Sequence, residues 1–260
     1  MIGLIKEELF HIIRKKRFIL LTAIAIIGVL VTSIITKNKY LNDLTYFFAI
    51  DNYIFYVFNS VIGFALIISV YRKKYTKNSI IQVEEHGVNR LSGVISRTIS
   101  CSLILIVCYA LTILFIIVLG LILGANLSSV QTGELALKLT FDCLACITTY
   151  VIAQFWLYLF AFPVVPVIIY ELLMLGATAL YHVMSGGYIA NTYRIIRFIS
   201  PKALTDSIYT NVLLYNNNIK YYSLLLLQIT VPFLFTLIVF KLKKKERKKK
   251  KSRVSAQEES

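Results

Sequence analysis

The sequence has few of the residues that build catalytic or metal centres. Its 260 residues include only three histidines, His11, His86 and His182, which are far apart along the chain. It contains no pattern with the spacing of a zinc site, a phosphate-binding loop or a nucleophile elbow. These absences exclude an ATPase and any recognisable enzyme class, so we expect no metal or cofactor to be held by this chain.

Cysteine is scarce as well, and all four cysteines lie within apolar runs: Cys101, Cys108, Cys143 and Cys146. The spacing of Cys143 and Cys146 is that of a redox or metal pair, but neither a second pair nor a histidine is nearby. We therefore expect the four thiols to be small buried apolar side chains without disulfides.

Charged residues make up only 16% of the chain, whereas 58% are hydrophobic and the mean hydropathy is +0.73. This apolar content exceeds the need of a soluble domain. A membrane-spanning helix needs roughly 20 mostly apolar residues, and six stretches qualify: 18–35, 52–71, 99–123, 139–160, 163–182 and 221–240. Because the runs are continuous and do not alternate, they predict an all-α membrane protein with six transmembrane helices.

The net charge of +15 is concentrated in three segments. Residues 1–17 carry +3, residues 72–98 carry +4 and residues 241–260 carry +7. Six spans put these segments on one side, which the positive-inside rule identifies as the cytoplasm. Both termini are expected there. The outer loops would be 36–51, 124–138 and 183–220.

Residues 1–17 are predicted to form an amphipathic interfacial helix, since apolar residues recur at spacings of three and four. These residues are Ile2, Ile5, Leu9, Ile12 and Ile13. The alternative is a simple extension of the first span. In the outer loop 183–220, a short helix is expected at 189–199, stopped by Ser200 and Pro201. The basic tail, 241–260, is predicted to be disordered and attracted to anionic lipid rather than to nucleic acid.

Few polar residues interrupt the predicted spans, and such groups in a membrane are candidates for function. They are Asn59, Asp142, Gln154 and Glu171. Asp142 is expected at the outer end of the fourth span, within reach of water, and Glu171 near the middle of the fifth. Either these residues line a substrate path, or they hydrogen-bond between helices.

The segment 80–97, IIQVEEHGVNRLSGVISR, places acids, glycine, leucine and a Ser-Arg pair between the second and third spans. An amphipathic helix with basic residues precedes the first span, Ser200-Pro201 follows the fifth, and FKLKKKE ends the sixth. In this order of features the chain resembles the permease subunits of type-2 ABC exporters, the ABC-2 family.

The resemblance implies a cytoplasmic elbow helix at 1–17 and a coupling helix in 72–98 that seats in a separate ATPase. The residues implied to contact the ATPase are Ile81, Val83, Glu84, Glu85, Gly87, Arg90 and Leu91. Two copies of a soluble ATPase would bind ATP, and a second permease subunit, identical or a sister, would complete the path.

By the same resemblance, the chain would export or extract a hydrophobic or amphiphilic substrate, such as an antimicrobial peptide, as in bacitracin and lantibiotic immunity systems. It would lie in a bacterial plasma membrane. Two other functions stay open. One is a membrane-embedded enzyme using Asp142, Glu171 and His182, and the other is a non-transporting anchor that recruits a soluble partner.

Overall fold

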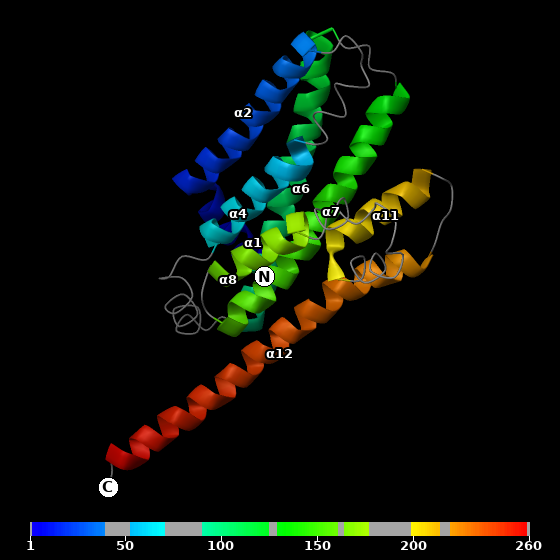
Figure 1. Ribbon diagram of the computed structural model, residues 1–260. Helices are drawn as coiled ribbons and strands as arrows, with labels where there is room; N and C mark the ends of the chain where they lie inside the picture. Colours follow the sequence, from blue (N-terminus) through cyan, green and yellow to red (C-terminus); the bar gives the residue numbers. More distant parts are fainter. Residues whose placement is uncertain are drawn as a thin grey trace.

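The protein is a bundle of helices, and the residues that this computed structural model describes contain no β-strand. They are residues 2–39, 53–70, 90–124, 129–160, 164–176, 199–213 and 219–258. Figure 1 shows long helices packed side by side, with the last helix leaving the bundle at its carboxyl end. The all-helical class predicted from the continuous apolar runs is confirmed.

Four helices are long and apolar enough to cross a membrane: α2 (Lys16–Lys39), α6 (Arg90–Ile122), α7 (Ser129–Phe160) and α12 (Ile219–Glu258). Their apolar windows are Lys16–Ile35, Ser92–Ile122, Gly133–Leu157 and Ile219–Val239. A helix satisfies its own backbone hydrogen bonds, as lipid requires. These windows overlap the first, third, fourth and sixth predicted spans.

The second and fifth predicted spans contain shorter helices. The π-helical turn η1 (Ile54–Phe58) leads into α4 (Asn59–Val70), and α8 (Val164–Glu171) leads into the π-helical turn η2 (Leu172–Gly176). The α-helical parts have 12 and 8 residues, or about 18 and 12 Å. This is less than the roughly 30 Å hydrocarbon core. The described chain thus has four candidate spans, and residues 177–182 of the predicted fifth span lie outside it.

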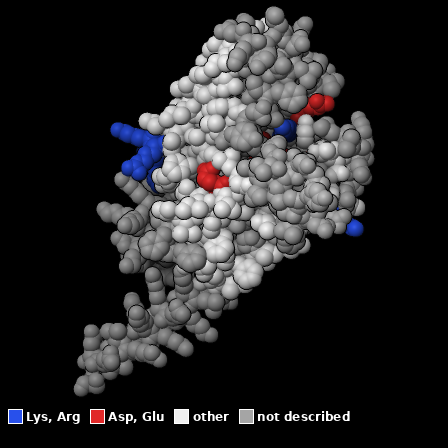
Figure 2. Space-filling view, in the orientation of Figure 1, with Lys and Arg blue, Asp and Glu red and all other residues white. Residues whose placement is uncertain are grey.

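The amino-terminal segment forms the predicted helix, α1 (Ile2–Ile13), which packs against the start of α6. Ile12 is fully buried, whereas Ile2 and Phe10 are 84% and 56% exposed. The apolar face is therefore only partly covered by protein. Arg14, which follows α1, and Lys16 and Arg17, which begin α2, are exposed, and Figure 2 shows basic side chains gathered at this edge.

A helix absent from the sequence prediction, α11 (Pro201–Leu213), lies within the loop assigned to 183–220. The Ser200 hydroxyl accepts a hydrogen bond of 3.3 Å from the backbone N–H of Ala203, and proline suits the first helical position. Ser200 and Pro201 begin this helix, whereas the helix that they were expected to stop lies almost entirely outside the described residues. Of the helix expected at 189–199, only Ile199 belongs to the described residues.

α11 packs against α7 and the beginning of α12. Leu204, Ile208 and Leu225 form a small apolar core there, and the rings of Phe141 and Tyr209 meet edge to face at 6.4 Å. The loop predicted between the fifth and sixth spans therefore contains a packed element of the bundle.

The basic carboxyl-terminal segment also differs from the prediction, because α12 continues as a helix through Glu258. The tail was expected to be disordered on account of its charge. It contains neither glycine nor proline, and lysine, arginine, glutamate and alanine are good helix formers. Figure 1 shows this part of α12 projecting away from the other helices.

Large apolar side chains cover much of the outer surface of α2, α6 and α12. Among them are Ile27 at 58%, Leu114 at 62% and Leu226 at 63% exposure. A surface of this kind is expected where a helix faces lipid, and it supports the interpretation of the chain as a membrane protein.

Candidate functional site

The four polar residues predicted to line a substrate path all lie in the described helices. Asn59, Asp142 and Gln154 expose 0%, 0% and 2% of their surface, while Glu171 is half-buried. Asn59 and Glu171 belong to the contact between α4 and α8, whereas Asp142 and Gln154 have partners elsewhere. The structure therefore does not bring the four residues into one site.

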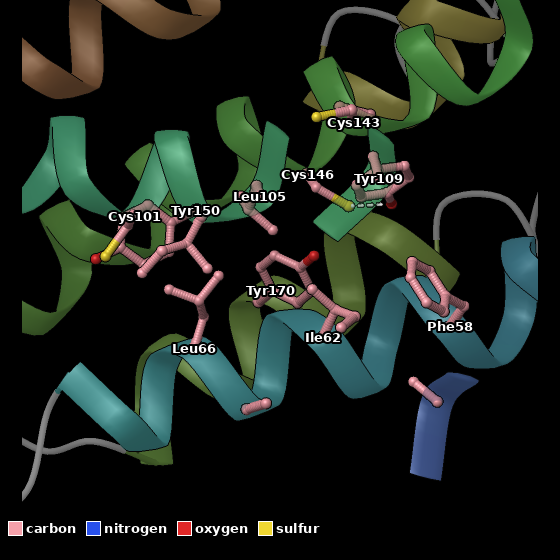
Figure 3. Packing of buried hydrophobic residues seen from close by; sticks show 14 of the residues in the cluster. Phe58, Ile62, Leu66, Cys101, Leu105, Tyr109, Cys143, Cys146, Tyr150 and Tyr170 are labelled. Carbon is pink, nitrogen blue, oxygen red and sulfur yellow. Dashed lines mark hydrogen bonds between the residues drawn. The ribbon is translucent and has the colours of Figure 1, made fainter. Parts of the chain in front are cut away.

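Asn59 belongs to a buried polar cluster shared by four helices. The Tyr109 hydroxyl on α6 donates to Asn59 Oδ1 and lies 3.0 Å from Cys146 Sγ on α7. The Tyr170 hydroxyl on α8 donates to the backbone carbonyl of Asn59 at 3.2 Å. Figure 3 shows Tyr170 between the α4 side chain Ile62 and the contact of Cys146 with Tyr109. This cluster joins the short helices to the long ones.

Gln154 accepts a hydrogen bond of 2.9 Å at Oε1 from the hydroxyl of Thr98 on α6. Thr98 is 9% exposed and also donates to the carbonyl of Val94 at 2.9 Å. Gln154 therefore hydrogen-bonds between two helices, which is the second of the two roles considered for it from the sequence.

Asp142 forms a buried ion pair with a lysine that the sequence analysis did not single out. Its Oδ1 lies 2.7 Å from Nζ of Lys202 on α11, and both side chains are 1% exposed. Lys202 also donates to Asp206, one turn further along α11. Asp142 was expected at the water-accessible end of a span, but α7 begins 13 residues earlier and α11 covers it.

The electrostatics of this cluster keep Lys202 charged. Burial by itself would lower the pKa of Lys202, but the carboxylates of Asp142 and Asp206 raise it above its usual value. Burial raises the pKa of Asp206, and Lys202 and Lys138 oppose this. The pairs Lys138/Asp142 and Lys202/Asp206 have the same four-residue spacing on two facing helices, a pattern that is visible in the sequence.

Glu171 lies at the end of α8, with its carboxyl group beside the Ser60 hydroxyl of α4. Within the described residues, no lysine, arginine or histidine forms an ion pair with it. Its neighbour Tyr170 covers Gly63, where a Cβ atom would come within 2.1 Å of the tyrosine ring. The absence of a side chain at Gly63 therefore permits the close contact of α4 and α8.

The start of α6 is held to α1 by polar contacts. Arg97 Nη2 lies 2.9 Å from Glu8 Oε1, and the Ser100 hydroxyl donates to the Ile5 carbonyl at 3.1 Å. Burial, followed by the charge of Lys15, lowers the pKa of the nearby His11. The arginine of the Ser96-Arg97 pair therefore contacts α1 within this chain.

Of the residues implied to contact an ATPase, Arg90 and Leu91 begin α6. The other five lie outside the described residues: Ile81, Val83, Glu84, Glu85 and Gly87. His86 and His182 also lie outside them.

All four cysteines have free thiols, and three of them are buried. The described parts of the chain contain no group of three histidine, cysteine, aspartate or glutamate side chains arranged to hold a metal ion. No family model and no curated protein matches the sequence.

Proposed function

We propose that this chain is a membrane-spanning subunit of an ATP-driven transporter of the ABC-2 permease type. A separate soluble ATPase, in two copies, would bind ATP. A second permease subunit, identical or a sister, would complete the path for a hydrophobic or amphiphilic substrate. The proposed setting is a bacterial plasma membrane with both termini in the cytoplasm.

The observation that carries the proposal is the length and placement of α6. This helix is continuous for 33 residues, or about 50 Å, and it begins at Arg90, inside the segment 80–97 proposed to contact the ATPase. A continuous helix moves as a rigid element. A displacement of its first turn by an ATPase would therefore reach the opposite end of the bundle.

The docking of α1 supports the same proposal. Glu8 and Ile5 of α1 bind Arg97 and Ser100 of α6, within about two to three turns of Arg90. At the start of α2, Lys15 donates to the Ser69 carbonyl near the end of α4. A movement imposed at the start of α6 would thus be shared by α1, α2 and α4.

The proposal is tested by affinity purification of the full chain in a mild detergent, with ATP hydrolysis measured in the eluate. We expect a soluble ATPase to co-purify. Replacing Glu85→Ala or Arg90→Ala should reduce its recovery about tenfold or more, since truncating one partner of an interfacial charge pair commonly costs 2–5 kcal/mol.

The matched control is Glu134→Ala, which removes an exposed carboxylate on α7. It should leave ATPase recovery unchanged. Absence of ATP hydrolysis from every eluate, or equal loss with the control, would reject the proposal.

A further inference from the structure

Among the described residues, Glu171 has no countercharge, and it lies in an apolar part of the bundle. It is the one charged residue in the described elements η1, α4, α8 and η2, and no described basic side chain forms an ion pair with it. The other charged groups near the core are paired, Arg97 with Glu8 and Lys202 with Asp142. A carboxylate in apolar surroundings is costly unless something positive reaches it.

The geometry leaves this carboxylate accessible at the rim of a packed interface. Tyr170 is 1% exposed because its ring lies on Gly63 and its hydroxyl reaches the Asn59 carbonyl. The next residue along the helix is rotated by about 100°, so Glu171 lies beside the tyrosine and stays half-buried. The Ser60 hydroxyl is its polar neighbour.

An exposed apolar stripe on α8 leads to this carboxylate. Val164, Ile168 and Leu172 are 63%, 57% and 62% exposed. Their spacing of four residues places them on one face of the helix, and Glu171 lies three residues after Ile168 on the same side. The surface thus combines one negative group with an adjoining apolar strip of about 12 Å.

Two π-helical turns flank the site. The turn η1 ends immediately before Asn59, whose N–H bonds to the Ile54 carbonyl, and η2 begins immediately after Glu171. Single π-helical turns inside helices occur frequently at functional sites. This is an observation independent of the charge at Glu171.

We infer that Glu171 binds the cationic head group, an ammonium or a guanidinium, of an amphiphile whose apolar part lies along Val164, Ile168 and Leu172. A carboxylate suits such a group, since charge-assisted hydrogen bonds are about twice as strong as neutral ones. As a statement about the transported substrate, the inference rests on the proposed function. Binding itself requires no ATPase.

The test measures equilibrium binding of a fluorescent alkylammonium to the purified full chain in nanodiscs of neutral lipid. An alkyl sulfate of equal chain length is the comparison probe. We expect the ammonium to bind more tightly than the sulfate, and Glu171→Gln to weaken its binding about tenfold to a hundredfold. Glu134→Gln, which neutralises an exposed carboxylate on α7, should leave both affinities unchanged.

The inference is overturned if Glu171→Gln binds the ammonium as tightly as the natural chain does. It is also overturned if the natural chain binds the ammonium and the sulfate with equal affinity. An infrared absorption band of protonated Glu171 that persists at saturating ammonium would also overturn the inference. The carboxyl group would then bind a proton and not the ammonium. If Glu171→Gln fails to fold, Glu171→Asp carries the test, with an intermediate affinity expected. Absence of a co-purifying ATPase would reject the transporter while leaving this binding result intact.

Discussion

At the scale of single residues, Lys202 is a charged side chain almost entirely withdrawn from solvent. Its ammonium lies between Asp142 and Asp206, which raise its pKa and keep it protonated in spite of burial. Removing one partner of a buried ion pair leaves an uncompensated charge, whereas removing both partners costs less. The pair therefore acts as a specific contact that fixes α11 on α7.

The first prediction concerns this pair. Lys202→Met and Asp142→Asn should each lower the free energy of unfolding by about 3–5 kcal/mol. The double variant should be less destabilised than the sum of the two, because it leaves neither Asp142 nor Lys202 as an unpaired charge, and Asp206 loses Lys202 equally in Lys202→Met and in the double variant. Thermal unfolding in detergent measures the change in the free energy of unfolding for all three variants. The control Glu134→Gln should change it by about zero. Strict additivity would show that the two side chains do not interact.

At the scale of helices, the docking of α1 on α6 depends on pH through His11. Burial and the positive charges of Lys15 and Arg97 lower its pKa below the ordinary 6.5, and Glu8 opposes them. The docked state therefore binds a proton less readily than the undocked state. Its stability falls as the pH drops below about 6.5 and is fully present above that value.

A fluorophore attached to Gly3→Cys reports this docking, since no atom lies within 4 Å of a Cβ placed at Gly3. We expect its anisotropy to fall as the pH decreases through about 6.5. His11→Gln should remove most of that change. An equal pH response in the His11→Gln variant would assign the change to another group.

At the scale of the whole molecule, the number of candidate spans is even if α4 and α8 both cross the membrane or if neither does. If the four long helices are the spans, both termini are expected on one side, as they would be with six. The basic residues at both ends favour the cytoplasm. The two termini therefore share one side for four and for six spans, whereas the side of residues 125–128 differs between the two cases.

Epitope tags at the two termini should therefore be cleaved by protease from the same face of membrane vesicles. A tag inserted at 125–128, between α6 and α7, should be cleaved from the opposite face if α4 and α8 both cross the membrane, and from the same face as the termini if neither does. Intact and inverted vesicles provide the two measurements. Termini protected on opposite faces would require an odd number of spans.

The sequence by itself determined the helical class and the four long helices. Continuous apolar runs can satisfy their backbone polar groups only as helices in lipid, and this property is local to each run. It also determined that α1 would be a helix, because the spacing of Ile5, Leu9 and Ile12 is local too. The basic tail differed from the prediction of disorder because the residues of 241–258 have high helix propensity in spite of their charge.

Only the tertiary structure decided which polar residues meet. Asp142 and Lys202 are 60 positions apart in the sequence, and Glu171 meets Ser60 across a contact that Gly63 and Tyr170 permit. Such pairings depend on how helices pack, and hydropathy along the chain contains no information about that. The π-helical turns joined to α4 and α8 were likewise hidden, because an apolar run has the same composition whether it forms one α-helix or an α-helix joined to a π-helical turn.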